Sequence, residues 1–200
     1  MYLRLLSILM LSFVLISCVN VTPTPEEKKQ LAGKELYLLV KDKKKVWFNN
    51  AISDVFFYSI GGFIGGALGA ATMGEDVKSV SIEPTKILAQ KVYPIVLNRY
   101  SMVQSNNPKT RYVLEVNTLD LKFKNSLFSN KYALRYSSYV RLKDRVNNND
   151  IMQIDCKYGI DKEEKALTKD EWKANDYLEL KNELNRAINM CVDNIKSKLK

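Results

Sequence analysis

The sequence predicts an α+β domain in which a mainly antiparallel sheet of about four strands is covered by a central helix and a long C-terminal helix. Three observations support this fold class. Residues 112–123, 132–142 and 152–158 alternate apolar and polar side chains, as strands do. Residues 84–100 and 172–199 instead repeat apolar side chains every three or four positions, as helices do. With 200 residues, of which 46% are hydrophobic and 26% charged, the chain can form one ordinary domain.

The first strand is expected within residues 35–48, where two apolar runs flank the charged sequence KDKKK. This pattern allows either one strand with a charged bend or a hairpin. The central helix is expected to begin at Pro84, because proline suits the first helical turn. Pro94 should kink this helix or end it early. The apolar face that packs on the core comprises Ile87, Leu88, Val92, Ile95, Val96 and Tyr100.

The three later strands carry their own signals. Within residues 112–123 the apolar positions change from even to odd numbers, which predicts a β-bulge near Asn117 and Thr118. A turn is expected at residues 147–150. The inward faces of the strands on either side of that turn comprise Tyr132, Leu134, Tyr136, Ser138, Val140 and Leu142 before it, and Met152, Ile154, Cys156 and Tyr158 after it.

The terminal helix has both a start signal and an apolar stripe. Thr168 and Glu171 have the spacing of a capping box, in which each residue satisfies a backbone N–H near the other. The stripe that should face the sheet comprises Leu180, Leu184, Ile188, Cys191, Ile195 and Leu199.

The N-terminus carries an export signal. Residues 5–16 are apolar apart from two serines; this run is too short to span a bilayer but suits a signal-peptide core. It ends in the sequence LISC at residues 15–18, which resembles the lipobox of bacterial lipoproteins. The resemblance implies a signal peptide at residues 1–17 and a fatty-acid (palmitate-type) membrane anchor on Cys18. The alternative is a plain secretory signal with a chance cysteine.

The resemblance also implies a location. Val19 stands where many enterobacterial lipoproteins that stay in the inner membrane have aspartate, so the implied address is the outer membrane, facing the periplasm. Residues 18–33 are expected to form a lipidated tether, because the TPTP sequence favours extended backbone and residues 26–30 are polar. The single α+β domain then occupies residues 34–200.

An uncharged, glycine-rich segment interrupts this domain at residues 55–74 and holds six of the eight glycines. On a helix its glycines would form a flat face of the small-xxx-small type. The segment can be a flap packed on the sheet, a membrane contact or a contact between copies of the chain. The candidate contact residues are Phe56, Phe57, Gly61, Phe63, Gly65 and Gly69. No phosphate-binding pattern accompanies the glycines.

The net charge of +9 raises the question of an anionic partner. Export argues against nucleic acid. A basic cluster near a membrane suits anionic lipid head groups or lipopolysaccharide phosphates, although a solvated charged turn is the simpler explanation. The cluster comprises Lys41, Lys43, Lys44 and Lys45.

No enzymatic motif is evident. The absence of histidine excludes His-based triads and His-containing zinc sites, and three cysteines cannot form a four-cysteine metal site. We therefore expect neither a metal nor a cofactor. Glu115 and Asp120 could in principle serve a glycosidase, but nothing in the sequence marks them as a catalytic pair.

A disulfide bond is expected between Cys156 and Cys191. Once Cys18 is lipidated, these two thiols remain in an oxidising compartment. Cys156 lies on the inward face of a predicted strand and Cys191 on the apolar stripe of the terminal helix, so both should point into one layer. Two buried free cysteines are the alternative.

Residues 111–200 resemble a group of uncharacterised proteobacterial lipoproteins in the sequences YVLEVNTL (112–119), CKY (156–158) and EWKAND (171–176). The order of elements is also similar to that of the curli-secretion and TolB amino-terminal class of lipoprotein domains. We therefore expect a non-enzymatic, lipid-anchored envelope protein that binds an envelope partner or further copies of itself. The alternatives are an auxiliary lipoprotein of lipid or solute transport, and an oligomeric secretion or pore component that uses residues 55–74.

Overall fold

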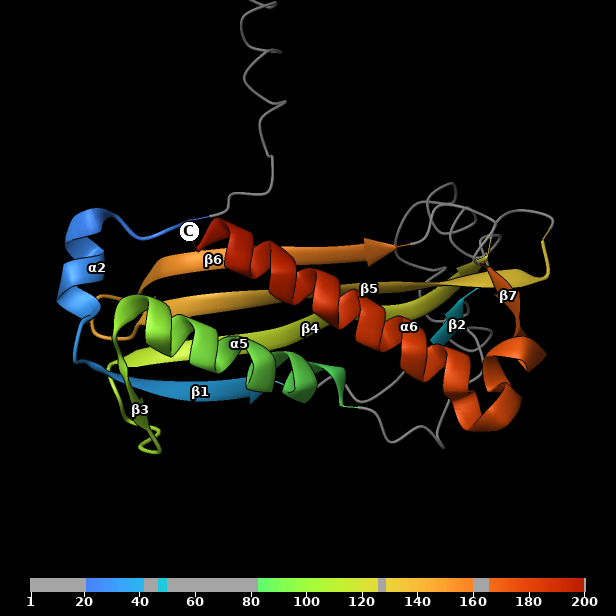
Figure 1. The fold of residues 1–200 in the computed structure, drawn as a ribbon, viewed down its shortest axis with the longest axis horizontal. Helices are drawn as coiled ribbons and strands as arrows, with labels where there is room; N and C mark the ends of the chain where they lie inside the picture. The colour runs from blue at the N-terminus through green and yellow to red at the C-terminus, as the bar shows by residue number, and fades with distance from the viewer. Residues whose placement is uncertain (1–20, 42–46, 50–82, 126–128, 160–165, 200) are drawn as a thin grey trace, which may run out of the picture.

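The computed structural model describes residues 21–41, 47–49, 83–125, 129–159 and 166–199, and it confirms the α+β class (Figure 1). One sheet has the strand order β3 (Val103–Ser105), β1 (Glu35–Lys41), β4 (Tyr112–Asn125), β5 (Lys131–Asp144) and β6 (Asn149–Gly159). Two short strands complete it: β2 (Trp47–Asn49) pairs with β4, and β7 (Leu167–Thr168) pairs with β5. The described helices are α2 (Pro25–Leu31), α5 (Pro84–Tyr100) and α6 (Lys169–Lys198).

Helices α5 and α6 lie across the same face of the sheet (Figure 1). The core lies between this face and the two helices, and the predicted apolar stripe of α6 is fully part of it. Few polar side chains enter the core. Thr85 of α5 and Thr118 of β4 satisfy each other there, with their hydroxyl oxygens 2.6 Å apart. The opposite face of the sheet carries no helix among the described residues.

The sheet is mixed and has more strands than expected. β1 is parallel to both β3 and β4, and β2 is also parallel to β4. The hairpin alternative for residues 35–48 is therefore wrong, because β1 and β2 run in the same direction along β4. A connection that contains α5 joins β1 to β4, and such a crossover places two strands side by side in parallel. Strands β3 and β7 are too short to produce an alternating pattern.

The antiparallel meander β4–β5–β6 agrees with the sequence prediction. The register of β4 against β5 shifts between Thr118 and Asp120, which confirms the predicted bulge one residue further along the chain. Leu119 is the inserted residue, and half of its surface is exposed. The predicted inward faces of β5 and β6 are all buried, including Ser138 at 1% exposure.

Helix α5 corrects one expectation. It continues through Pro94 to Tyr100, and Ser101 ends it in a left-handed conformation with φ of 51°. A proline inside a helix costs about 3 kcal/mol. Burial of the helix face, together with a 2.6 Å hydrogen bond from the Tyr93 hydroxyl to the carbonyl of Leu36, outweighs that cost.

Helix α6 begins as predicted, with the Thr168–Glu171 capping box in place. It is not continuous, however. Residues 174–177 leave the helical conformation, and three of them, Asn175, Asp176 and Tyr177, have positive φ. Asn and Asp adopt this conformation more readily than most residues, which helps to place the break there. The break lets Trp172 reach into the core, where its Nε1 donates to the carbonyl of Tyr132 at 2.8 Å.

The expectation of an extended tether is wrong from residue 21 onward. Residues 25–31 form helix α2, whose N-terminus is a second capping box: Glu27 N donates to Thr24 Oγ1 at 3.2 Å, and Thr24 N donates to Glu27 Oε2 at 2.7 Å. Leu31 is buried at 1% exposure. Val21 forms an isolated antiparallel bridge with Gln153 of β6. The chain is thus held against the domain before the first strand begins.

Candidate functional site

The candidate binding surface is the sheet face opposite α5 and α6, which we call the open face. Because side chains alternate along a strand, residues next to the buried positions of β4, β5 and β6 point to this face. Most of them are half-buried rather than covered. Its charged members include Lys41, Glu115, Asp120, Lys122, Lys124, Arg135, Arg141, Lys143, Asp150, Asp155 and Lys157.

A polar cluster lies at the centre of the open face. Glu115 of β4 is directly opposite Arg141 of β5. Its Oε1 accepts a 2.9 Å hydrogen bond from Lys41 Nζ of β1 and another from the Tyr139 hydroxyl. The Arg141 guanidinium carbon lies 4.8 Å from the centroid of the Tyr139 ring, a cation–π contact. Three neighbouring strands therefore build the cluster, and no single sequence segment contains it.

These contacts keep Glu115 ionised. Burial alone would raise the pKa of this carboxyl, but the hydrogen bonds from Tyr139 and Lys41 outweigh burial and hold its pKa below the ordinary value. Burial and the bond to Glu115 raise the pKa of Tyr139. The hydrogen bond to Glu115 likewise raises the pKa of Lys41. An ionised carboxylate that two donors already occupy stabilises the sheet and is poorly suited to accept a proton in catalysis.

Glu115 and Asp120 do not form a catalytic pair. Their partners on β5 are Arg141 and Ser137, four positions apart, which separates the two backbones by about 13 Å. Carboxyl pairs in glycosidases are about 5–9.5 Å apart. Asp120 is instead 3.1 Å from Lys122 Nζ. Lys41 and Lys122 thus pair with the two carboxylates separately.

Of the predicted basic cluster, only Lys41 lies within the described residues. Its side chain is 51% exposed, but its ion pair with Glu115 neutralises most of its charge. Lys43, Lys44 and Lys45 lie outside the described residues, as do Cys18 and the six candidate contact residues of the glycine-rich segment.

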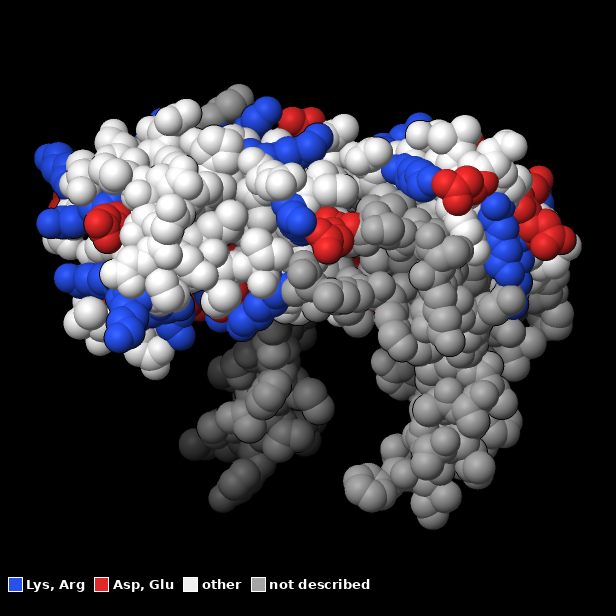
Figure 2. Space-filling view, turned by 90° about the horizontal axis from the view of Figure 1, so that it is seen from below, with Lys and Arg blue, Asp and Glu red and all other residues white. Residues whose placement is uncertain are grey.

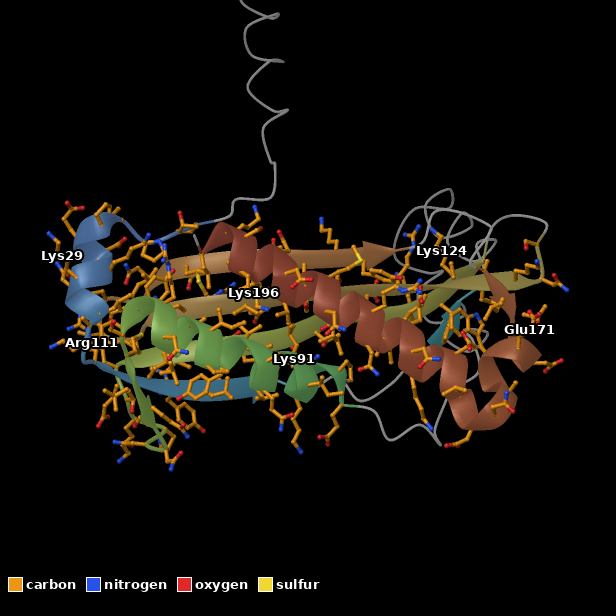
Figure 3. All side chains as sticks on the ribbon, viewed as in Figure 1. Lys29, Lys91, Arg111, Lys124, Glu171 and Lys196 are labelled. Atoms are coloured by element: carbon orange, nitrogen blue, oxygen red, sulfur yellow. The ribbon has the colours of Figure 1, made fainter. Side chains whose placement is uncertain are left out.

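Basic side chains also gather at the end of the domain that carries β3 and α2 (Figure 2). Arg111 lies there, whereas Glu171 lies at the opposite end (Figure 3). Arg111 holds the buried Asp144 through two hydrogen bonds, of 3.0 Å from Nε and 2.6 Å from Nη2. Asp144 also accepts hydrogen bonds from the backbone of Val146 and Asn147, in the turn between β5 and β6. This part of the basic surface therefore stabilises a turn.

Cys156 of β6 and Cys191 of α6 meet in the core. Both are buried free thiols, at 2% and 3% exposure. Ser138 Oγ lies 3.9 Å from Cys191 Sγ. A hydrogen bond from the Cys191 thiol lowers the pKa of Cys156 despite its burial. That same hydrogen bond, together with burial, raises the pKa of Cys191. The two thiols therefore lie within hydrogen-bonding reach of each other.

Sequence reasoning missed the Glu115 cluster and the Arg111–Asp144 pair. Both depend on strand pairing between residues far apart in the chain, for which the sequence carries no local signal. The α2 capping box, in contrast, could have been found from the TPEE sequence at residues 24–27.

The described residues contain no group of three or more Cys, Asp or Glu side chains arranged to hold a metal ion. Within the same part of the chain, no helix has both the length and the apolar character needed to cross a membrane.

The similarity of this chain to known proteins is limited to its architecture. No family model matches the sequence, and no curated protein sequence matches it either. Among solved structures, the chain is similar to a DUF330 protein from Xanthomonas campestris, with 9% identity and a TM-score of 0.47 over 91% of this chain and 92% of that one. It is also similar to a minor lipoprotein from Acinetobacter baumannii, with 14% identity and a TM-score of 0.39 over 84% and 92% of the two chains. The PelC dodecamer from Paraburkholderia phytofirmans gives 10% identity and a TM-score of 0.35 over 89% and 93%. At these scores the likenesses say nothing about what this chain does.

Proposed function

We propose that this chain is a lipid-anchored protein of the bacterial cell envelope that acts as a non-enzymatic binding or assembly module on the periplasmic side of the outer membrane. The observation that carries the proposal is the LISC sequence at residues 15–18, directly after a short apolar run. Acyl chains on Cys18 would hold the domain at a bilayer, since each buried methylene contributes about 0.8 kcal/mol.

The open face is the surface that we assign to binding. Helices cover only one side of the sheet among the described residues, and Lys and Arg outnumber Asp and Glu on the other side. The contacts within the central cluster hold its charged side chains in place without help from a ligand. This arrangement favours a partner that carries acidic groups.

Fatty-acid labelling tests the anchor. Cells that express the full chain should incorporate a palmitate analogue into it, and Cys18→Ala should abolish this incorporation. The matched controls are Cys156→Ala and Cys191→Ala, which remove the two other cysteines and should leave labelling intact. Continued labelling of Cys18→Ala would contradict the proposal.

Membrane separation tests the address. The parent should sediment with the outer membrane of an enterobacterial host, and Val19→Asp should move it to the inner membrane, whereas Val19→Ala should not. If the parent itself sediments with the inner membrane, the outer-membrane part of the proposal is wrong.

Photo-crosslinking in intact cells tests the binding surface. A photoreactive residue in place of Ser137, on the open face of β5, should give a specific adduct. The same residue in place of Asp193, on the solvent side of α6 with its side chain 76% exposed, should not. Equal adducts at both positions would remove the reason to assign binding to the open face.

A further inference from the structure

The start of the described chain is attached to one edge of the sheet. The Val21 backbone N–H donates to the carbonyl of Gln153 at 3.1 Å, and the Gln153 N–H donates to the carbonyl of Val21 at 3.0 Å. Gln153 lies in the middle of β6, the last strand on that side of the sheet. Pro23, two residues after the bridge, is buried. The chain is therefore docked on the domain well before helix α2.

This attachment shortens the stretch of chain between a lipid on Cys18 and the domain. Val21 is three positions after Cys18 in the chain, so their Cα atoms lie within about 11 Å of each other. A free tether over residues 18–33 would instead reach about 55 Å. With the bridge formed, the middle of β6 cannot move far from the membrane surface.

We infer that the domain is oriented, with the β6 edge of the sheet and the adjacent side of α6 against the lipid head groups. This inference rests on the proposed lipidation of Cys18. The C-terminal end of α6 lies on the same side as the start of the described chain (Figure 1), and Lys196 is near that end (Figure 3). Next to β6, α6 exposes Met190, at 54%, and Ser197.

The chemistry of this edge suits a head-group layer. Asn194 of α6 donates to the Asp155 carbonyl of β6, which joins helix and strand into one surface. Lys157 on β6 and Lys198 on α6 add basic charge, while Asp155 offsets part of it. Since the charge is mixed, the short attachment sets the orientation, and salt should change it little.

The opposite edge of the sheet should lie away from the membrane. From β6 to β3 there are four strand spacings, or about 19 Å. The open face then stands upright between the two edges and remains accessible to a partner in the periplasm. The orientation thus explains how a domain so close to the bilayer can still present the open face.

Fluorescence quenching by labelled lipids tests the orientation. The probe is the purified, lipidated chain in phosphatidylcholine vesicles that contain a head-group nitroxide lipid. A fluorophore is attached to Ser197→Cys, beside β6, or to Lys109→Cys, in the turn after β3. Because the two positions lie near opposite edges of the sheet, whose outer strands are about 19 Å apart, we expect quenching at least about twofold stronger at Ser197→Cys, with or without added salt. The unsubstituted chain controls for labelling of Cys156 and Cys191, which are buried.

A lengthened chain provides the matched control. Twelve Gly and Ser residues inserted directly before Val21 would extend the reach from Cys18 to about 55 Å, and the difference in quenching between the two labels should then shrink. Equal quenching at both positions without the insertion, or stronger quenching at Lys109→Cys, would overturn the orientation. Mass spectrometry of the N-terminal peptide separates the two proposals: without a lipid on Cys18 the proposed function fails, whereas a lipidated protein with equal quenching refutes the orientation alone.

Discussion

Reduction of the predicted Cys156–Cys191 disulfide should destabilise the domain strongly. The two thiols are buried, one on β6 and one on α6, and they lie within hydrogen-bonding reach of each other. A bond between them would close a loop of about 36 residues, for which the chain-entropy relation gives about 13 cal/mol/K. At 25 °C this corresponds to about 4 kcal/mol, a large part of the 5–15 kcal/mol that typically holds a domain together.

Urea unfolding of the exported, soluble Cys18→Ala form measures this difference. With a slope of about 2 kcal/mol per molar urea, the oxidised protein should unfold at a midpoint about 2 M higher than the reduced protein. The Cys156→Ser/Cys191→Ser double variant is the control, because reductant should not move its midpoint. Two reactive thiols in the unfolded, non-reduced protein, or equal midpoints with and without reductant, would refute the reasoning.

Three further predictions concern stability and attachment. Asp144→Asn should lower the free energy of unfolding at pH 7 by about 2 kcal/mol in urea titrations. The hydrogen bond from Arg111 holds the pKa of Asp144 below its ordinary value, so the parent keeps this contribution above about pH 4 and loses it as the pH falls through the folded-state pKa. The free energies of unfolding of the two proteins should therefore converge in acid. A difference between them that is constant with pH would contradict this. Trp172→Ala should lower the free energy of unfolding by about 3–5 kcal/mol, since the ring is buried and its centroid lies 4.9 Å from that of Phe123. A loss below about 1 kcal/mol by the same method would show that the first turn of α6 contributes little to stability. Val21→Pro removes the N–H that bridges to β6, so amide hydrogen exchange at Gln153 should accelerate. Val21→Thr keeps this N–H and should leave the exchange rate unchanged. If the Gln153 amide stays protected in Val21→Pro, the bridge does not hold this segment.

Patterns within short stretches of sequence predicted most of the meander and both long helices. The buried stripe of α6 and the inward faces of β5 and β6 follow from side-chain periodicity, which depends only on local backbone geometry. The Thr168 capping box and the bulge at Leu119 are similarly local. In each case the residues that form the feature are close together in the sequence.

Two expectations were wrong because packing in the folded domain overrides the local backbone preference of a short segment. Pro94 disfavours a helix locally, but α5 continues because its buried face is worth more than the lost hydrogen bond. Residues 18–33 look like a polar tether, but Leu31 contributes enough apolar surface to dock helix α2. For the candidate site, the sequence paired the two thiols and named Lys41 and Glu115 separately, but it did not show that Lys41 and Tyr139 both meet Glu115.

The sequence by itself determined the α+β class and the inward-facing side chains, because both depend on residues that are neighbours along the chain. Only the tertiary structure decided that β1 lies parallel to β4, that Glu115 meets Lys41 and Tyr139, and that Val21 attaches to β6. These contacts join residues separated by 24 to 132 positions. Their formation depends on which strands become neighbours when the whole core is buried, and local sequence patterns do not encode that choice.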